Sequence, residues 1–180
     1  MMKKYFTSDL HLGHNNIIKY CDRPFRHAHH MNATLIRNIQ ERVKPDDILF
    51  HLGDFCCKGP ERGVPGCKTK AAAWEKLIDR RIVHIAGNHD KNNSVKWGLG
   101  HATIEFAAKV WLMIHIPPRD LADLPCECDA VLCGHVHEKW HTKMVGDIPV
   151  INVGVDVNRF IPLGIKDVEK LYWLTMKGLK

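Results

Sequence analysis

The first half of the chain alternates short apolar strands with segments of helical periodicity, and this alternation limits its possible folds more than any other feature. Apolar and β-branched residues predict strands at residues 4–7, 47–52 and 81–86. Between them, helices are expected over about residues 30–43 and 71–78, where apolar residues recur at helical spacing. This order favours a parallel sheet with right-handed crossovers, whose ligands gather outside the carboxyl ends of the strands.

The second half differs, because short apolar runs follow one another with only brief turns between them. These runs predict strands at residues 109–114, 130–133, 143–145 and 149–153, with little helix among them. The last apolar stretch, residues 168–176, fits a helix or a strand, and a helix is the favoured interpretation. The length of 180 residues is close to the usual size of one domain, so we expect a single α/β domain over residues 1–180.

The net charge favours anionic partners without choosing among them. Lysine and arginine number 26 against 20 acidic residues, which gives a charge of +6. A charge of this sign attracts phosphate-bearing molecules over a long range. It also lies within the roughly 2–8 charges that a small domain carries for solubility, so solubility alone explains it equally well.

The sequence indicates neither a membrane span nor an export signal. Asp9 and His11 interrupt the apolar run at the N-terminus, and nowhere do about 20 apolar residues follow one another. The seven cysteines contain no C-x-x-C pair and are expected to be reduced thiols. We therefore expect a cytoplasmic protein with no membrane partner.

A segment rich in glycine, proline and basic residues follows the second predicted strand. Residues 57–70 are typical of a surface loop rather than of a linker. This loop either flanks a substrate cleft or is simply solvated, and the second alternative is favoured.

Polar clusters follow five of the predicted strands. All offer oxygen or imidazole ligands, and in order they are Asp9-Leu-His11, Gly53-Asp54, Gly87-Asn88-His89-Asp90, His115 and Gly134-His135-Val-His137. Such donors suit Mn, Fe, Zn, Co or Ni, and the near absence of thiolates argues against a site for soft metals. Each cluster taken alone can be explained without a metal, as a turn or as a chance pairing of residues. Five in succession, each after an apolar strand, indicate a metal centre.

The spacing within the clusters has a physical explanation. In D-x-H and H-x-H, alternate residues of an extended segment point the same way, so two side chains are expected to converge on one cation. The glycines before Asp54, Asn88 and His135 are expected to let the chain turn tightly and approach an ion or a phosphate closely.

Together, the motifs D-x-H, G-D, G-N-H-D, H and G-H-x-H resemble the signature of the calcineurin-like metallophosphoesterase family. They run from Asp9 to His137, with a weaker trailing match at Asn152-Val-Gly154. The string HLGHNNIIKYCDRPF also resembles a small bacterial and phage subgroup of this family. The resemblance implies a four-layer α-β-β-α sandwich with two mixed sheets. One departure is that Ile-Pro-Pro follows His115 in place of a single residue and one proline, which affects the shape of that loop more than the ligand.

The resemblance also implies which residues bind metal. Two divalent cations are expected, bridged by the carboxylate of Asp54. One cation would take Asp9, His11 and His137. The other would take Asn88, His115 and His135.

By the same resemblance, His89 and Asp90 are the catalytic residues. His89 would face the substrate, bind phosphate and give a proton to the leaving oxygen. Asp90 would orient the imidazole of His89, and its alternative role is to cap the segment that follows.

The expected activity is that of a metal-dependent phosphoesterase, a hydrolase acting on a phosphomonoester or phosphodiester of a small molecule or nucleotide. A hydroxide bridging the two cations would attack phosphorus directly. Two metals roughly 3.5–4 Å apart can activate water near neutral pH and clamp the attacking and leaving oxygens.

Two alternatives are weighed against this activity, one within enzymes and one from a different class. A nuclease acting on DNA or RNA would use the same site, but the chain has no basic run interleaved with aromatic residues. A non-catalytic metal-binding scaffold for protein partners is the other alternative, and the complete ligand set with His89 argues against it.

Four basic residues are either phosphate contacts or ordinary surface charges, the second being favoured: Arg23, Arg26, Lys58 and Arg62.

Overall fold

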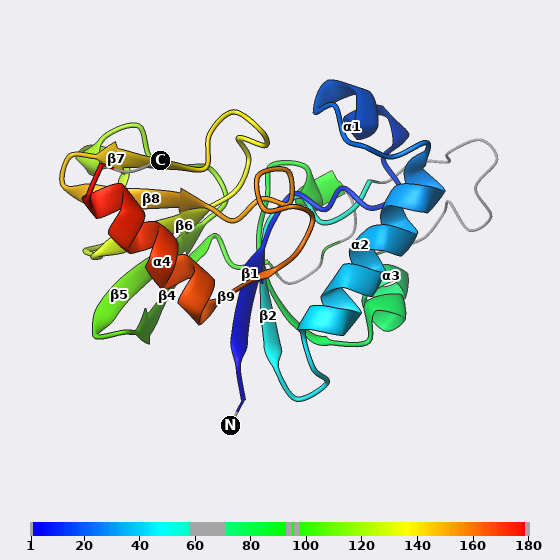
Figure 1. The fold of residues 1–180 in the computed structure, drawn as a ribbon, viewed down its shortest axis with the longest axis horizontal. Coiled ribbons are helices and arrows are strands. Elements are labelled where there is room, and N and C mark those ends of the chain that lie inside the picture. The colour runs from blue at the N-terminus through cyan, green and yellow to red at the C-terminus, as the bar shows by residue number, and fades with distance from the viewer. Residues whose placement is uncertain (1, 58–70, 93–94, 96–97, 179–180) are drawn as a thin grey trace.

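The computed structural model describes residues 2–57, 71–92, 95 and 98–178. Nearly all of the predicted loop over residues 57–70, with Lys58 and Arg62, lies outside the described residues. The described residues form two β-sheets and four α-helices, with two helices beside one sheet and the C-terminal helix at the opposite end of the view (Figure 1).

The first sheet has the strand order β3-β2-β1-β9. Three parallel strands and one antiparallel edge strand form it: β1 (Lys4–Thr7), β2 (Ile48–Leu52), β3 (Arg81–Ile85) and β9 (Leu163–Gly164). In their register, Thr7 stands opposite His51, and His51 stands opposite His84. The parallel strands therefore end nearly level with one another, and their carboxyl ends share one edge of the sheet.

The second sheet has the order β4-β5-β6-β8-β7. Its strands are β4 (His101–Phe106), β5 (Lys109–Ile114), β6 (Ala130–Cys133), β7 (Thr142–Val145) and β8 (Ile148–Asn152). β5, β6 and β8 are parallel, while β4 and β7 pair antiparallel at the two edges. The carboxyl ends of β5 and β6 therefore carry the last two polar clusters to a common end of this sheet.

The helices follow from the apolar spacing of the sequence. The α-helices are α1 (Asn15–Tyr20), α2 (Ala28–Arg42), α3 (Ala71–Ile78) and α4 (Ile165–Met176), and the short 3-10 helices are η1 (Asp90–Asn92) and η2 (Leu121–Asp123). Met31, Leu35 and Ile39 recur every four residues and form the buried face of α2. They share one hydrophobic cluster with Leu49 of β2 and Ile78 of α3, so α2 and α3 cover the outer face of the first sheet.

The core between the sheets is built from side chains that alternate with those facing the helices. Phe6, Leu52 and Ile85 of the first sheet share a cluster with Trp111 and Leu132 of the second, and all five are fully buried. Burying a side chain of this size contributes roughly 1.5–3 kcal/mol. The two sheets are thus held face to face, with their carboxyl-end clusters adjacent.

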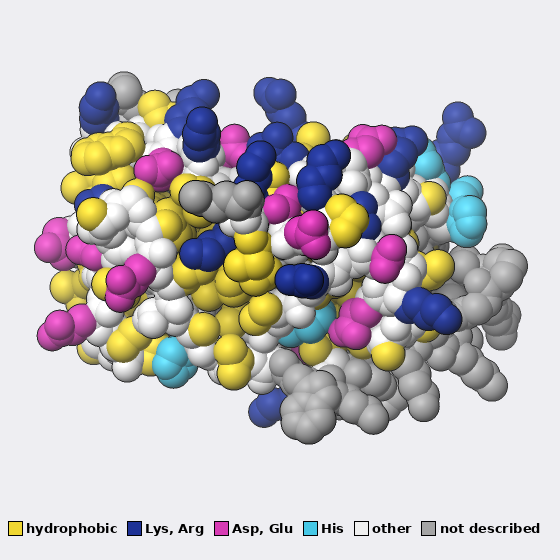
Figure 2. All heavy atoms as spheres, turned by 90° about the horizontal axis from the view of Figure 1, so that it is seen from below, with side chains coloured by type: hydrophobic (Ala, Val, Ile, Leu, Met, Phe, Trp, Pro, Cys, Tyr) yellow, Lys and Arg dark blue, Asp and Glu magenta, His cyan; other side chains and the backbone are white. Residues whose placement is uncertain are grey.

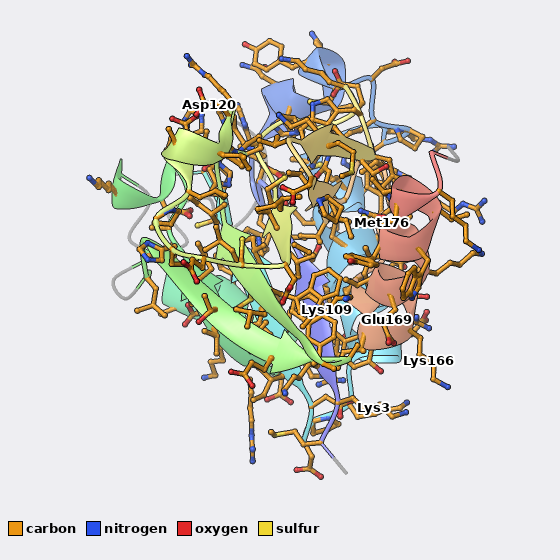
Figure 3. All side chains as sticks on the ribbon, turned by 90° about the vertical axis from the view of Figure 1, so that its left-hand side faces the viewer. Lys3, Lys109, Asp120, Lys166, Glu169 and Met176 are labelled. Carbon is orange, nitrogen blue, oxygen red and sulfur yellow. The ribbon has the colours of Figure 1, made fainter. Side chains whose placement is uncertain are left out.

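α4 packs against β7, β8 and β9, and its Val168 and Tyr172 belong to the cluster between the sheets. The ammonium group of Lys109 on β5 lies 4.9 Å from the centre of the Tyr172 ring, and Figure 3 shows Lys109 beside α4. On the outer face of the second sheet, non-helical residues such as Leu124 and Trp140 provide cover. Among the described residues, loop side chains therefore cover the outer face of the second sheet, and α4 packs at the side of the core between the sheets.

The predicted α/β class with two mixed sheets is confirmed, as are the parallel order of the first half and the helix over residues 168–176. Sequence patterns missed α1, β4 and β9. α1 has six residues and β9 two, which is too short for a period to appear. None of the helices in the described part of the chain combines the length and apolar character needed to cross a bilayer.

Candidate metal centre

The structure brings all seven predicted metal ligands together beside the carboxyl ends of the strands. Direct contacts link them in a chain that runs from Asp9 to His137, from His11 through Asp54 to His115, and from His115 through Asn88 to His135. The main chain joins the two ends, because the His135 N–H donates to the Asp9 carboxylate at 3.0 Å.

Five of these residues adopt the left-handed backbone conformation, which is uncommon outside glycine. Their φ angles are 58° for Asp9, 48° for His11, 58° for Asp54, 70° for His135 and 49° for His137. Each such residue costs of order 1–3 kcal/mol and persists only where the surrounding structure compensates. The expectation that D-x-H and H-x-H are extended segments is therefore wrong, and the side chains converge because the chain coils tightly after each strand.

Glycine is required beside the centre for two reasons. Gly53 has a φ of +93°, which favours glycine, and a Cβ atom there would collide with the His115 ring. Gly87 is needed for space, because a Cβ atom there would collide with the amide nitrogen and the carboxylate of Asp54.

Asp9, His11 and His137 form the first ligand group. Ligand atoms of the three lie within 4.8 Å of one another, and Nε2 of His137 is 4.0 Å from Oδ1 of Asp9. The His11 and His137 rings stack with centroids 5.2 Å apart. Nε2 of His11 is buried without a hydrogen-bond partner among the described residues.

Asn88, His115 and His135 form the second ligand group. Oδ1 of Asn88 lies 2.9 Å from Nε2 of His115 and 3.1 Å from Nδ1 of His135. Nδ1 of His115 lies 2.8 Å from the carbonyl oxygen of Leu52 and donates to it, so Nε2 is the ring nitrogen that faces the cluster.

Asp54 lies between the two groups. Its Oδ2 atom is 3.5 Å from Nε2 of His11 and 3.5 Å from Nε2 of His115. Oδ1 accepts a 3.0 Å hydrogen bond from the backbone N–H of His89, which fixes the carboxylate. Asp9, Asp54 and His115 also form a set of ligand atoms within 4.8 Å of one another.

Electrostatics favour the metal-binding protonation state in two of these side chains, His11 and Asp54. Burial lowers the pKa of His11 to about 3, so its ring is neutral and retains a lone pair. Burial raises the pKa of Asp54, but the hydrogen bond and positive charge of His115 outweigh this effect and hold that pKa well below its ordinary value. Neutral imidazole and ionised carboxylate are the forms that coordinate cations.

This donor set fits divalent cations. It offers carboxylate, amide and imidazole atoms, which suit first-row transition metals. A buried imidazole nitrogen with no hydrogen-bond partner, as in His11, would be costly unless another ligand satisfied it. A cation between His11 and Asp54 would do so.

His89 lies at the exposed side of the cluster. Its side chain is 63% exposed, compared with 2% for Asp54, and its Nε2 atom is 4.0 Å from Oδ2 of Asp54. The ring of His89 meets the ring of His11 edge-on at 5.9 Å. A solvent-facing imidazole beside a buried set of ligands is well placed to meet an incoming substrate.

Asp90 is buried, and its carboxylate accepts hydrogen bonds from the main chain. Oδ2 accepts from the amides of Gly87 at 2.8 Å and Asp54 at 2.9 Å, and Oδ1 accepts from Phe55 at 3.0 Å. Asp90 therefore joins the G-N-H-D turn to the loop that carries Asp54. That Asp90 also orients the His89 imidazole stays a prediction.

Arg23 and Asp156 belong to the surroundings of the centre, although sequence reasoning did not place them there. Arg23 is only 4% exposed and pairs with Asp156. It is therefore neither a surface charge nor exposed to contact a phosphate. Asp156 in turn lies 2.8 Å from Nδ1 of His137. No local signal marks this pair, because its members lie 133 positions apart.

Asn152 explains the trailing Asn-Val-Gly match. It is fully buried at the end of β8, and its amide group donates to the carbonyl oxygens of His137 at 2.8 Å and Trp140 at 2.9 Å. These bonds hold the loop that presents His135 and His137.

Charges are mixed on the face away from the centre. Figure 2 views the molecule from below Figure 1, the side on which β1 begins. Lysine and arginine side chains lie there among acidic and apolar ones. On that face, the described residues form no single basic patch.

Comparisons with known proteins found a family model, a sequence relative and a solved structure that resemble this chain. A family model described as the calcineurin-like phosphoesterase superfamily domain matches residues 2–159. Uncharacterized protein MJ1445 of Methanocaldococcus jannaschii is 32% identical over 178 residues, which cover 95% of this chain and 92% of that protein. The solved structure of the protein of unknown function AQ665 from Aquifex aeolicus aligns with a TM-score of 0.69 and 24% identity, over 95% of this chain and 100% of that one. The structural likeness establishes the fold alone.

Proposed function

This chain belongs to the calcineurin-like phosphoesterase superfamily, and from that premise we propose that it is a metal-dependent hydrolase of phosphate esters with two cations in its centre. The observation that carries the proposal is the position of Asp54, whose Oδ2 atom is 3.5 Å from one imidazole of each ligand group. A carboxylate in that position supports a bridging role.

The first ligand group binds one cation in this proposal and the second ligand group binds the other, with Asp54 shared. Mn, Fe, Zn, Co and Ni all suit these donors. When bound, two such cations supply water that ionises near neutral pH and neutralise charge on the phosphoryl oxygens.

His89 is the proposed proton donor. It is exposed where a substrate would arrive, and its Nε2 atom lies within 4.0 Å of Asp54. Protonating the leaving oxygen typically accelerates such a reaction ~10²–10⁴-fold. Asp90 contributes by fixing the main chain on either side of the shared carboxylate.

The proposed substrates are phosphomonoesters or phosphodiesters of small molecules or nucleotides. A nuclease is the alternative within the same chemistry, and the lack of a basic run interleaved with aromatic residues does not favour it. A non-catalytic scaffold would bind the cations and hydrolyse nothing.

An activity screen with defined metals tests the proposal. Purified protein is stripped with a chelator, reloaded with Mn²⁺, Fe²⁺, Zn²⁺, Co²⁺ or Ni²⁺ in turn, and assayed on phosphomonoesters, linear phosphodiesters and cyclic phosphodiesters. We expect hydrolysis with at least one metal and its loss in Asp54→Asn. The control is Asp120→Asn, an exposed carboxylate that accepts from the backbone of Ala122.

Three outcomes of this screen are decisive. Metal-loaded protein that cleaves none of the esters would support the scaffold alternative. Full activity in Asp54→Asn would contradict the proposal that the carboxylate of Asp54 is shared by the two cations. Cleavage of DNA or RNA far faster than of small esters would favour the nuclease.

A further inference from the structure

A buried arginine–aspartate pair lies directly behind the first ligand group. Nε of Arg23 donates to Oδ1 of Asp156 at 2.7 Å, and Nη2 donates to Oδ2 at 2.9 Å. The side chains are 0% and 2% exposed. This two-bond geometry is specific to guanidinium and carboxylate, and a lysine could not reproduce it.

Asp156 also fixes the ring of His137. Its Oδ2 atom accepts a 2.8 Å hydrogen bond from Nδ1 of His137. The other ring nitrogen, Nε2, then faces Oδ1 of Asp9 at 4.0 Å. A carboxylate behind an imidazole sets its tautomer and orientation, which tunes its binding of a cation on the far side.

Arg23 also holds the loop that carries the other two ligands of this group. Nη2 donates to the carbonyl oxygen of Asp9 at 2.7 Å, and Nη1 donates to that of Leu10 at 3.2 Å. These carbonyls lie between two residues of left-handed conformation, Asp9 and His11. The guanidinium group therefore helps to stabilise a strained stretch of main chain.

The pair links three segments that are distant in sequence: the loop after β1, the segment before α2 and the loop after β8. Burying two charges brings little net stability, because the cost of desolvation offsets most of their attraction. Apolar side chains of similar size would serve stability as well. The hydrogen bonds to His137 and to the Asp9 loop are what apolar side chains could not provide.

We propose that Arg23 and Asp156 are positioning residues for a cation held by Asp9, His11 and His137: they pre-arrange the His137 ring and the Asp9 loop in the geometry that binds it. This inference rests on the proposed function, in which that cation is present. Among the described residues no hydrogen bond or ion pair joins this pair to the second ligand group, so the effect is expected at one of the two sites.

The test is a calorimetric titration of metal-free protein with Mn²⁺, together with electron paramagnetic resonance of the loaded protein. Asp156→Asn keeps the size of the side chain and removes its charge. Because this variant leaves Arg23 buried opposite a neutral group, a second variant, Arg23→Met with Asp156→Leu, removes both charges together. The matched control is Asp167→Asn, which breaks an exposed arginine–aspartate pair with Arg42 at 2.6 Å.

In the unmodified protein and in Asp167→Asn, we expect two Mn²⁺ ions and the spectrum of a magnetically coupled pair. In both Asp156 variants, one site is expected to keep its affinity while the other weakens about 10–100-fold, the range found when a carboxylate behind a metal-binding histidine is lost. The spectrum should then change to that of isolated Mn²⁺ at concentrations that fill only the tighter site.

The failures of the two proposals can be told apart. If the folded Asp156 variants bind both Mn²⁺ ions as tightly as the unmodified protein does, the positioning role is overturned and the proposed function stays intact. Weakening of both sites alike would overturn the confinement to one site, and with it the inference. An unmodified protein that binds none of Mn²⁺, Fe²⁺, Zn²⁺, Co²⁺ and Ni²⁺ would overturn both.

Discussion

Asp90 holds the main chain of Asp54, since its Oδ2 atom accepts a 2.9 Å hydrogen bond from the Asp54 amide. The same carboxylate accepts from the amides of Gly87 and Phe55. One buried side chain thus satisfies three main-chain donors and joins the turn after β3 to the loop after β2. The position of the Asp54 carboxylate depends on this joint.

Asp90→Asn is expected to destabilise the protein by about 1–3 kcal/mol, because an amide NH₂ group would face main-chain donors that then lose their acceptor. Urea unfolding of the metal-free protein measures this loss. Asp120→Asn, which alters an exposed acceptor, should change stability by less than about 0.5 kcal/mol. Equal stability of the two variants would show that the Asp90 joint is dispensable.

His89→Ala is expected to affect catalysis without affecting folding. With a poor leaving group such as an alkoxide, the rate should fall ~10²–10⁴-fold, because no proton is delivered to the departing oxygen. With 4-nitrophenyl esters the loss should be small, because nitrophenolate departs without a proton. His101→Ala removes another exposed imidazole, on β4, and serves as the control. Similar losses on both kinds of ester would contradict the role of proton donor.

Gly87→Ala and Gly100→Ala form a second matched pair. A Cβ atom at Gly87 would collide with Asp54, whereas one at Gly100 meets no atom within 4 Å. We expect the first substitution to cost about 1–3 kcal/mol through overpacking and to weaken Mn²⁺ binding. The second should be neutral within about 0.5 kcal/mol. Thermal unfolding with and without Mn²⁺ gives both quantities, and normal metal affinity in Gly87→Ala would refute the close-approach argument.

Cation binding is expected to release a proton from His137. Burial lowers the pKa of this ring, but the hydrogen bond with Asp156, the contact with Cys21 and the charge of Asp9 raise it to about 10. At pH 8 the metal-free ring is therefore protonated, and a cation must displace the proton from Nε2. His11, with a pKa of about 3, releases none.

Competition between the proton and the cation for Nε2 of His137 sets the direction in which Mn²⁺ affinity changes with pH. Affinity for Mn²⁺ should rise with pH, by up to about tenfold per unit below the pKa of His137. Calorimetry at pH 8 in two buffers of different ionisation enthalpy measures the release, and Asp156→Asn should diminish it. Heats that do not depend on the buffer would contradict the prediction.

Much of the fold was predictable because its apolar pattern is strong. α3, β5 and β6 have the bounds that their apolar runs predict. β4 was missed, since its alternation of exposed and half-buried residues contains only two large apolar side chains. α4 was ambiguous in sequence and is fixed as a helix by packing against β7, β8 and β9.

The gathering of the seven predicted ligands was predictable because each follows a strand, and parallel strands deliver their carboxyl ends to one place. Their local backbone conformation was not predictable, because the left-handed conformations at Asp9 and His135 depend on tertiary contacts. Arg23 and Asp156 were beyond reach for a similar reason, because a pair separated by 133 positions leaves no periodic or local trace.

Anomalous X-ray diffraction from crystals of the Mn²⁺-loaded protein would show directly whether two cations lie on either side of Asp54. We expect two peaks roughly 3.5–4 Å apart, one beside each ligand group, with the carboxylate of Asp54 in contact with both. A single peak, or peaks remote from Asp54 in crystals grown with excess Mn²⁺, would contradict it.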